Sequence, residues 1–139
     1  MRLSDLEYVV DIERGTLSPW SVSSLADECR VANGLSFVAV NDDIVGWCCC
    51  RTIWPEAELL KITVSPVKRG LGIGYMLLKK MLTELACNRF NTLFLEVRAG
   101  NRAALQFYQR NDFFQVGLRC DYYSDPLDNA LVLRRDILL

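Results

Sequence analysis

A strand, a glycine-rich turn and an amphipathic helix follow one another directly between residues 61 and 87. Lys61–Val64 has the composition of a short strand, and Ser65 and Pro66 end it. The glycines of the next segment, residues 69–74, allow tight backbone turns that point several N–H groups at one place. A helix begins within this segment, and its apolar residues recur with helical spacing at Leu77, Leu78, Met81, Leu82 and Leu85. This unit predicts a helix that packs on a sheet and presents its N-terminus to an anion.

Hydrophobic periodicity predicts the remaining elements. A capping-box pattern at Ser4–Glu7 predicts a first helix that ends near Gly15, and Ser21 begins a second one that runs to about Val31. Strands are expected at 36–40, 44–53, 59–64, 92–97, 113–119 and 130–135, and a further helix at 102–110. The order α-α-β-β-β-α-β-α-β-β predicts an α/β (α+β) protein of one domain, residues 1–139, with a mixed sheet flanked by about four helices.

Composition excludes several kinds of site. The chain has no histidine, which excludes His-based catalytic triads and zinc sites that need imidazole. Its net charge of −1 argues against direct binding of nucleic acid. The six cysteines form no Cys-x-x-Cys pair, so we interpret them as buried packing residues in a reducing compartment and expect no metal. The N-terminus has no signal-peptide core and no segment approaches the ~20 apolar residues of a membrane span, which predicts a cytoplasmic protein without membrane contact.

The glycine-rich turn fits neither of two common phosphate-binding motifs. A Walker A loop requires Lys-Ser/Thr after its last glycine, and the dinucleotide fingerprint requires a different glycine spacing. The segment does match Arg/Gln-x-x-Gly-x-Gly/Ala, as Arg69-x-x-Gly72-x-Gly74. That pattern resembles the acetyl-CoA pyrophosphate loop of the GNAT family of N-acetyltransferases. By itself, so short a match is also compatible with an ordinary tight turn.

Motifs elsewhere extend this resemblance over nearly the whole chain. One match to the family's N-terminal acetyltransferase branch is the segment from Leu95 to Asn101, followed by Ala103-Ala104 and Phe107-Tyr108. Three further segments are similar to the same branch: Pro19-Trp20-Ser21 near the N-terminus, and Arg119–Tyr123 and Asp128–Leu131 near the C-terminus. The resemblance implies a mostly antiparallel GNAT sheet and an enzyme that acetylates the N-terminal alanine of a bacterial small-subunit ribosomal protein. One departure is Asp112, where the family carries glycine, and aspartate tolerates the left-handed conformation less well.

The resemblance also implies acetyl-CoA as the co-substrate and identifies the segments that bind it. In the family, the strand that matches Ile62, Thr63 and Val64 holds the pantetheine arm, much as a peptide adds to the edge of a sheet. Their side chains alone are equally compatible with ordinary sheet residues. The pyrophosphate is implied to lie on Arg69, Gly70, Leu71, Gly72, Ile73 and Gly74.

Glu96 is the candidate general base. It interrupts an apolar strand, sharing one face with Phe94 while Leu93, Leu95 and Val97 share the other. The pattern alone favours a solvated glutamate on the outer face. The resemblance implies instead a base that acts directly or through water, and the absence of histidine leaves few other proton acceptors. An α-amine, with a pKa of about 8 against about 10.4 for lysine, suits such a modest base.

Tyr108 and Asn101 complete the implied catalytic and cofactor sites. Tyr108 follows Ala104 by one helical turn on the face toward the sheet, and the family implies that its phenol donates a proton to the leaving thiolate. A packed aromatic with a satisfied hydroxyl is the alternative. Asn101 is implied to contact acetyl-CoA, and its type also predicts the N-cap of the helix that begins at Arg102.

The acceptor is the least determined part of the prediction. We assign Trp20, Tyr122 and Tyr123 to substrate binding, although the pattern of the two tyrosines is equally compatible with edge-strand aromatics. The expected partner is the N-terminus of an acceptor protein, and the expected state is a monomer or weak dimer. Two alternatives stay open: a GNAT enzyme that acts on lysine or a small-molecule amine, and a non-catalytic acyl-CoA-binding module.

Overall fold

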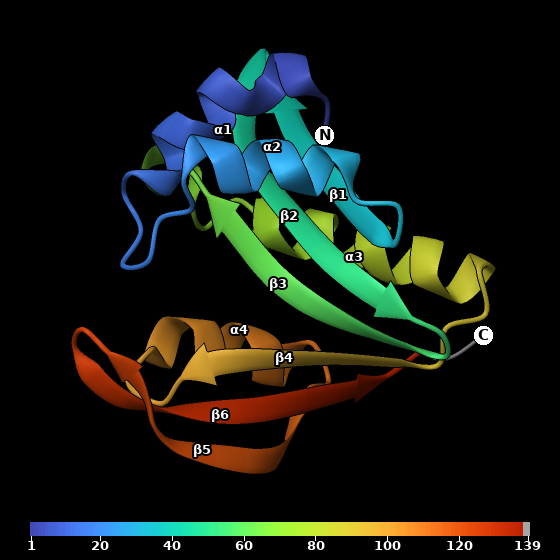
Figure 1. The fold of residues 1–139 in the computed structure, drawn as a ribbon, viewed down its shortest axis with the longest axis vertical. Coiled ribbons are helices and arrows are strands. Elements are labelled where there is room, and N and C mark those ends of the chain that lie inside the picture. The colour runs from blue at the N-terminus through green and yellow to red at the C-terminus, as the bar shows by residue number, and fades with distance from the viewer. Residues whose placement is uncertain (138–139) are drawn as a thin grey trace.

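A six-stranded sheet organises the computed structural model, which describes residues 1–137 (Figure 1). The strand order is β1-β2-β3-β4-β6-β5, in which β3 and β4 pair in parallel and the other neighbours are antiparallel. The mixed, mostly antiparallel sheet predicted from the sequence is confirmed. The strands are β1 Gly34–Asn41, β2 Asp43–Ile53, β3 Glu56–Val64, β4 Thr92–Arg98, β5 Phe114–Ser124 and β6 Leu127–Asp136.

Side chains cap the first turns of two helices, α2 and α4. Ser21 accepts a hydrogen bond from the Ser24 N–H, and α2 follows it directly. The predicted capping box at Ser4–Glu7 is wrong: a 3-10 turn precedes the first helix, and the Asp5 carboxylate accepts from the Arg2 N–H at 2.7 Å. Among residues 1–137, no helix has the length and apolar character that crossing a bilayer requires. The helical segments are η1 Leu3–Asp5, α1 Leu6–Glu13, α2 Val22–Arg30, η2 Pro66–Lys68, α3 Ile73–Cys87 and α4 Arg102–Arg110.

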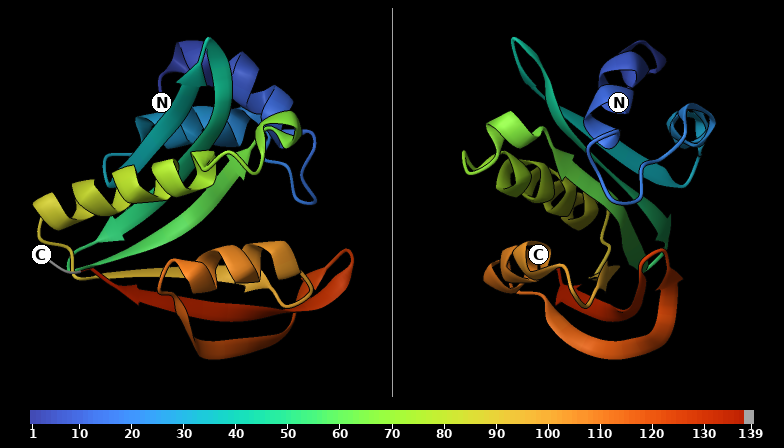
Figure 2. Two further views of the ribbon diagram at one scale, coloured as in Figure 1. Left: turned by 180° about the vertical axis from the view of Figure 1, so that it is seen from behind. Right: turned by 90° about the vertical axis from the view of Figure 1, so that its left-hand side faces the viewer.

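The helices cover the sheet on both faces, as Figure 2 shows. On one face, α1 and α2 pack over β2, where Val9, Leu25 and Trp47 form a small core. On the other face, α3 and α4 enclose the larger core, to which β4 contributes Leu93, Leu95 and Val97. Because α1 and α2 extend over only the β1–β3 half, the outer face of β4 and its neighbours is less covered. Glu96 lies on that outer face.

The six cysteines differ in burial, with Cys29 partly buried. Cys48, Cys49 and Cys50 on β2 are fully buried and alternate between the two cores, as the packing interpretation predicts. Burial raises the pKa of Cys48 to about 12 and that of Cys50 to about 11, so both thiols stay protonated. The interpretation is wrong for Cys87 and Cys120, which are exposed: one ends α3 and the other lies in an irregular part of β5.

β5 is longer than predicted. It continues past Arg119 to Ser124, and its pairing with β6 is irregular between Arg119 and Tyr123. Asp121 within this irregular stretch has a φ of 52°, so the chain turns there without ending the strand. Asp112 also adopts a positive φ, of 65°, as expected for a residue that takes the place of glycine after α4.

Candidate active site

β3 and β4 open away from each other in the middle of the sheet. They pair from Glu56–Thr92 to Leu59–Leu95, and Figure 1 shows them diverging beyond that point. The pairing of β2 with β3 skips Leu60, which forms a bulge. This bulge follows directly after Leu59, the last residue of β3 that pairs with β4. A bulge bends its strand and increases its twist. The bend therefore leaves the β4-facing backbone groups of residues 60–64 without a ladder partner in β4.

Ile62, Thr63 and Val64, the predicted pantetheine segment, lie on this unpaired edge. Ile62 and Val64 pack into the core beneath α3, and Thr63 points to the opposite face, where its hydroxyl donates to Glu13 at 3.1 Å. Their side chains are thus all engaged in packing or hydrogen bonding. The edge offers its backbone, which is the group that strand-like binding of an extended ligand requires.

The glycine-rich turn lies between β3 and α3 and has room for an anion. Gly70 and Gly72 have φ values of 77° and 82°, and a Cβ on either would meet no atom within 4 Å. Gly72 is the N-cap of α3, and no side chain caps the first turn. Because a helix leaves its first N–H groups without intrahelical partners, this turn combines free donors with open space and fits a pyrophosphate.

The other members of the predicted turn take different places. Leu71 is exposed, and Ile73 packs against the core. Gly74 faces Phe107 of α4, which a Cβ would meet at 3.5 Å. The Arg69 Nε donates to the Val64 carbonyl at 3.1 Å, so the guanidinium lies beside the end of the unpaired edge.

Glu96 lies on the outer face of β4, next to the opening, with its side chain 18% exposed. Arg119 of β5 reaches its Oε1 at 3.2 Å. The phenol of Tyr122 also hydrogen-bonds to the Glu96 carboxylate. This hydrogen bond and the negative charge of Glu96 raise the pKa of Tyr122, because both favour the protonated phenol. The predicted base is therefore held by residues of β5 and remains reachable from the outer face of the sheet.

Tyr122 lies beside this carboxylate, and Tyr123 packs against the ring of Tyr122. Their rings meet edge to face at 5.0 Å, and Arg98 stacks over Tyr123 at 4.2 Å. Burial raises the pKa of Tyr123, and the charge of Glu96 raises it further. The structure thus places Tyr122, which is half exposed, beside the predicted base, and Tyr123 next to Tyr122.

Tyr108 approaches the opening from the other face of the sheet. It is buried in the core that α4 shares with β4, with its ring edge to face against Phe107 and Phe113. Burial raises the pKa of its phenol, to which the nearby Cys48 and Tyr123 also contribute. The phenol therefore keeps its proton at neutral pH. Glu96 and Tyr108 lie on opposite faces of β4.

Asn101 caps α4, as its residue type predicts: its Oδ1 accepts from the Ala104 N–H at 3.1 Å. The side chain is exposed and lies at the end of β4 that is farther from the paired segment. This capping role is compatible with a contact to a ligand in the opening.

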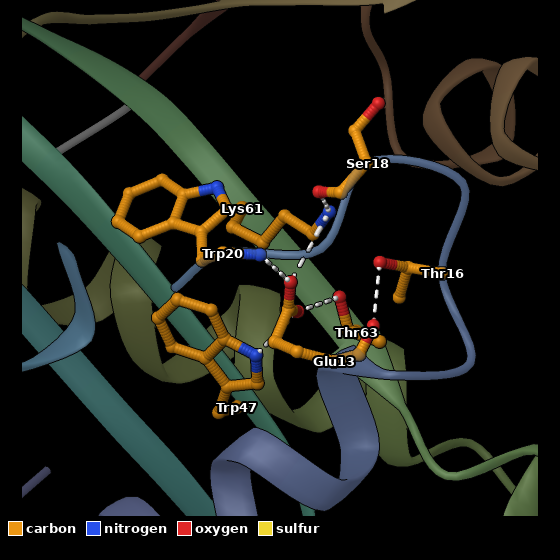
Figure 3. A network of polar contacts seen from close by, with 7 residues as sticks. All are labelled: Glu13, Thr16, Ser18, Trp20, Trp47, Lys61 and Thr63. Carbon is orange, nitrogen blue, oxygen red and sulfur yellow. Dashed lines mark hydrogen bonds and ion pairs between the residues drawn. The ribbon is translucent and has the colours of Figure 1, made fainter. Parts of the chain in front are cut away.

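Trp20 lies in the α1–α2 loop (residues 14–21), with its ring edge to face on Trp47 at 5.6 Å. Its backbone N–H donates to Glu13 at 3.0 Å, part of the polar network in Figure 3. The loop and the tip of the β5–β6 hairpin (residues 120–128) lie on the same side of the molecule, where β3 and β4 diverge (Figures 1 and 2). The predicted acceptor residues Trp20, Tyr122 and Tyr123 thus come from two segments that flank the opening.

Three residues of this region are not predicted by the sequence patterns: Glu13, Arg98 and Arg119. Each is a charged residue in a helix or strand, where a solvated position is the ordinary expectation. Opposite charges at Glu96 and Arg119 are a usable signal only once the register of β4, β6 and β5 is known. Among residues 1–137, no group of acidic or cysteine side chains is arranged to hold a metal ion.

A mixed sheet that opens at a bulge, beside an uncapped glycine-rich helix start, is the architecture of thioester-dependent N-acetyltransferases. The chain belongs to the acetyltransferase (GNAT) family, whose model matches residues 6–113. It is 33% identical over 133 residues to the [ribosomal protein bS18]-alanine N-acetyltransferase of Haemophilus influenzae, a match that covers 93% of this chain and 90% of the relative.

Solved structures agree with this assignment. The ribosomal-protein-S18-alanine N-acetyltransferase from Escherichia coli matches with a TM-score of 0.91 and 29% identity, over 100% of this chain and 92% of that one. The PaiA N-acetyltransferase from Thermoplasma acidophilum, solved in complex with coenzyme A, shares the fold with a TM-score of 0.83 and 19% identity, over 98% of this chain and 95% of that one. The family uses acetyl-CoA as the acetyl donor.

Proposed function

We propose that this enzyme transfers an acetyl group from acetyl-CoA to the α-amine of a protein that begins with alanine, a ribosomal protein of the bS18 type. The observation that carries the proposal is the opening between β3 and β4, which has Glu96 on one face and Tyr108 on the other. The names of the relatives from Haemophilus influenzae and Escherichia coli support the choice of acceptor. The enzyme meets the acceptor as an extended N-terminus.

The chain's own backbone provides the cofactor site. When bound, acetyl-CoA supplies the thioester whose acetyl group forms the new amide and whose sulfur leaves as a thiolate. The unpaired edge at residues 62–64 holds the pantetheine arm by strand-like hydrogen bonds. The N–H groups around Gly72 bind the pyrophosphate, and Asn101 lies at the far end of the opening.

Glu96 and Tyr108 divide the proton handling. Glu96 accepts the proton that the α-amine loses, directly or through a water, because the amine must be neutral to attack a carbonyl. Arg119 holds the carboxylate in place. Tyr108 is the proton donor for the departing thiolate, and its raised pKa keeps the proton on the phenol until it is needed. Placement on opposite faces separates the two tasks in space.

The acceptor enters from the outer face, between the α1–α2 loop and the hairpin tip. Trp20 belongs to the loop on one side of this entrance, and Tyr122 and Tyr123 belong to the hairpin tip on the other. The aromatic rings and the adjacent Glu96 suit a short uncharged first residue followed by an extended chain.

An acetylation assay on a peptide array that varies the first four residues tests the acceptor. We expect turnover that requires a free α-amine and a small first residue, with alanine preferred, and no turnover of peptides whose N-terminus is blocked. Turnover of lysine or small amines without turnover of N-terminal peptides would show the alternative GNAT activity. Coenzyme A binding without any acetyl transfer would identify a non-catalytic module.

Substitutions at the two catalytic residues test the mechanism. We expect Glu96→Gln to lower kcat by about 100-fold or more and Tyr108→Phe by about tenfold to 100-fold, the range for loss of a positioned acid or base. Because the pKa of Tyr108 is raised above the usual value near 10, the wild-type rate should show no alkaline decline below about pH 10. An alkaline limb near pH 8 would contradict the role of Tyr108.

A further inference from the structure

Glu13 is a carboxylate in an unfavourable place. It is the last residue of α1 and only 1% exposed. Burial of a charge is costly unless donors compensate for it, and a negative charge at a helix C-terminus opposes the helix dipole. Packing alone would be met by an apolar side chain here. The carboxylate must therefore be held by the contacts that it makes.

Each oxygen of this carboxylate contacts a different part of the molecule. Oε1 accepts from the Trp47 Nε1 at 2.9 Å and from the Thr63 hydroxyl at 3.1 Å, both in the sheet. Oε2 accepts from the Trp20 N–H at 3.0 Å, and the Lys61 Nζ lies 3.5 Å away from it. Figure 3 shows this arrangement. Glu13 thus joins the sheet through one oxygen and the α1–α2 loop through the other.

Residues 17–20 depend on this connection. Within the described chain they make no backbone–backbone hydrogen bond, and Pro19 has no N–H to donate. Two polar contacts hold their backbone: the Trp20 N–H to Glu13, and the Ser18 carbonyl, which accepts from the Lys61 Nζ at 3.1 Å. The pair formed by Glu13 and Lys61 therefore fixes the path of the loop.

This loop lies on the same side of the molecule as the hairpin tip, and the two flank the entrance proposed for the acceptor (Figures 1 and 2). We infer that Glu13, together with Lys61, is a positioning residue that holds the α1–α2 loop in the conformation that binds the acceptor N-terminus. The inference rests on the proposed function, because it assigns the loop to the acceptor. Thr63 links the same carboxylate to the β3 segment proposed for the cofactor. One buried side chain thus sets the acceptor loop relative to the cofactor strand.

Glu13→Gln is the first test, because the amide side chain has the same shape as the carboxylate. Its NH₂ group replaces one carboxylate oxygen, and each of those oxygens faces two donor groups of the protein. We expect the Trp20 amide to lose hydrogen-exchange protection, by about tenfold or more for one charge-assisted hydrogen bond. We expect the KM for an N-terminal alanine peptide to rise by a similar factor, while kcat and the KM for acetyl-CoA change less than about threefold. Lys61→Met should act in the same direction and leaves the buried carboxylate in place if the Gln variant does not fold.

Glu28→Gln is the matched control. Glu28 is also a buried carboxylate, but it pairs with Arg51 of β2 at 2.8 Å. It should leave both the Trp20 exchange and the peptide KM at wild-type values. Unchanged Trp20 protection in Glu13→Gln and Lys61→Met would overturn the inference, and so would lost protection with an unchanged peptide KM. A wild-type protein that acetylates no N-terminal peptide would overturn the proposed function, and the exchange data would still decide whether Glu13 fixes the loop.

Discussion

The α1–α2 loop and the tip of the β5–β6 hairpin flank the same opening but are held in place differently. The loop has no ladder of its own, and its polar contacts to the sheet pass through Glu13 and Lys61. The hairpin is paired almost to its end, at Tyr123–Asp128 and Ser124–Leu127. One segment thus depends on buried side chains and the other on its own backbone.

The hairpin also has several independent side-chain contacts. Arg98 donates to the Pro126 and Asp125 carbonyls at 2.8 and 3.2 Å and stacks on Tyr123. The Gly100 N–H donates to Asp128 at 3.0 Å, a separate link to the end of β4. The loss of one contact leaves the others. We therefore expect graded effects in the hairpin and abrupt effects in the loop.

Glu13→Ala should have the largest effect. It removes the acceptor of the buried Trp47 and Thr63 donors and leaves Lys61 without its partner. The free energy of unfolding should fall by about 3–5 kcal/mol, as for the breaking of a buried ion pair. Denaturant titration measures this free energy. Glu84→Ala is the control: Glu84 forms an exposed i,i+4 pair with Lys80, so its loss should change stability little. A loss below about 1 kcal/mol would remove the contrast between the two segments.

Arg98→Ala should have an intermediate effect. It deletes two hydrogen bonds to carbonyls and one cation–π contact, all partly exposed, so the free energy of unfolding should fall by about 1–2 kcal/mol. The KM for an acceptor peptide should rise about two- to fivefold, because the remaining pairs keep the hairpin near its place. A loss as large as that for Glu13→Ala would show that the hairpin also depends on one residue.

Alkaline pH should act on the hairpin through Tyr123. Burial, then the charge of Glu96, raises the pKa of Tyr123 above its unfolded value near 10. The unfolded chain therefore loses this proton first, and stability falls as the pH rises above about 10. Because Tyr123 is partly exposed, the slope it contributes should stay well below ~1.4 kcal/mol per pH unit.

Tyr123→Phe should make the alkaline decline shallower by the share of Tyr123 alone, in denaturant titrations at pH 9, 10 and 11, because the buried Cys48, Cys50 and Tyr108 contribute to the same decline. Tyr8→Phe on α1 is the control, since Tyr8 lies in the other half of the molecule. An equal decline in both variants would assign the effect to other groups.

Asp121→Gly should have the smallest effect and the opposite sign. The φ of 52° at Asp121 suits glycine better, so the variant should gain about 0.5 kcal/mol of stability. Asp121→Ala, which cannot relieve the strain, should lose a comparable amount. If both variants lose stability equally, the side chain of Asp121 rather than its backbone matters in the bulge.

The elements of the fold could be predicted because their signals are local. The helix Arg102–Arg110 is correct to the residue, since Asn101 caps it and the apolar spacing continues through it. The glycines at 70 and 72 similarly indicate positive φ angles from their type alone. The roles proposed for Glu96 and Tyr108 come from the resemblance, whereas the patterns alone favour a solvated glutamate and a packed tyrosine.

The network of Glu13 could not be predicted because its signal is not local. Between Asp11 and Arg14, Glu13 has the pattern of a solvated helix end. It is buried because β2 and β3 bring Trp47, Lys61 and Thr63 to the same point, 34 to 50 residues away in sequence. The extension of β5 was missed for a related reason: Asp121 has the composition of a turn, and only its pairing with β6 shows that the strand continues.

The bulge at Leu60 ends the ladder between β3 and β4 before either strand ends. A chain one residue shorter at this point could keep its register, and β3 could continue its ladder along β4 toward Val64. Each restored hydrogen bond would add about 0.5–1.5 kcal/mol of stability. The same change would close the edge that we propose for the cofactor. The bulge residue therefore lowers the stability of the sheet and leaves one strand position vacant. Deletion of Leu60 should raise the free energy of unfolding and abolish the binding of acetyl-CoA.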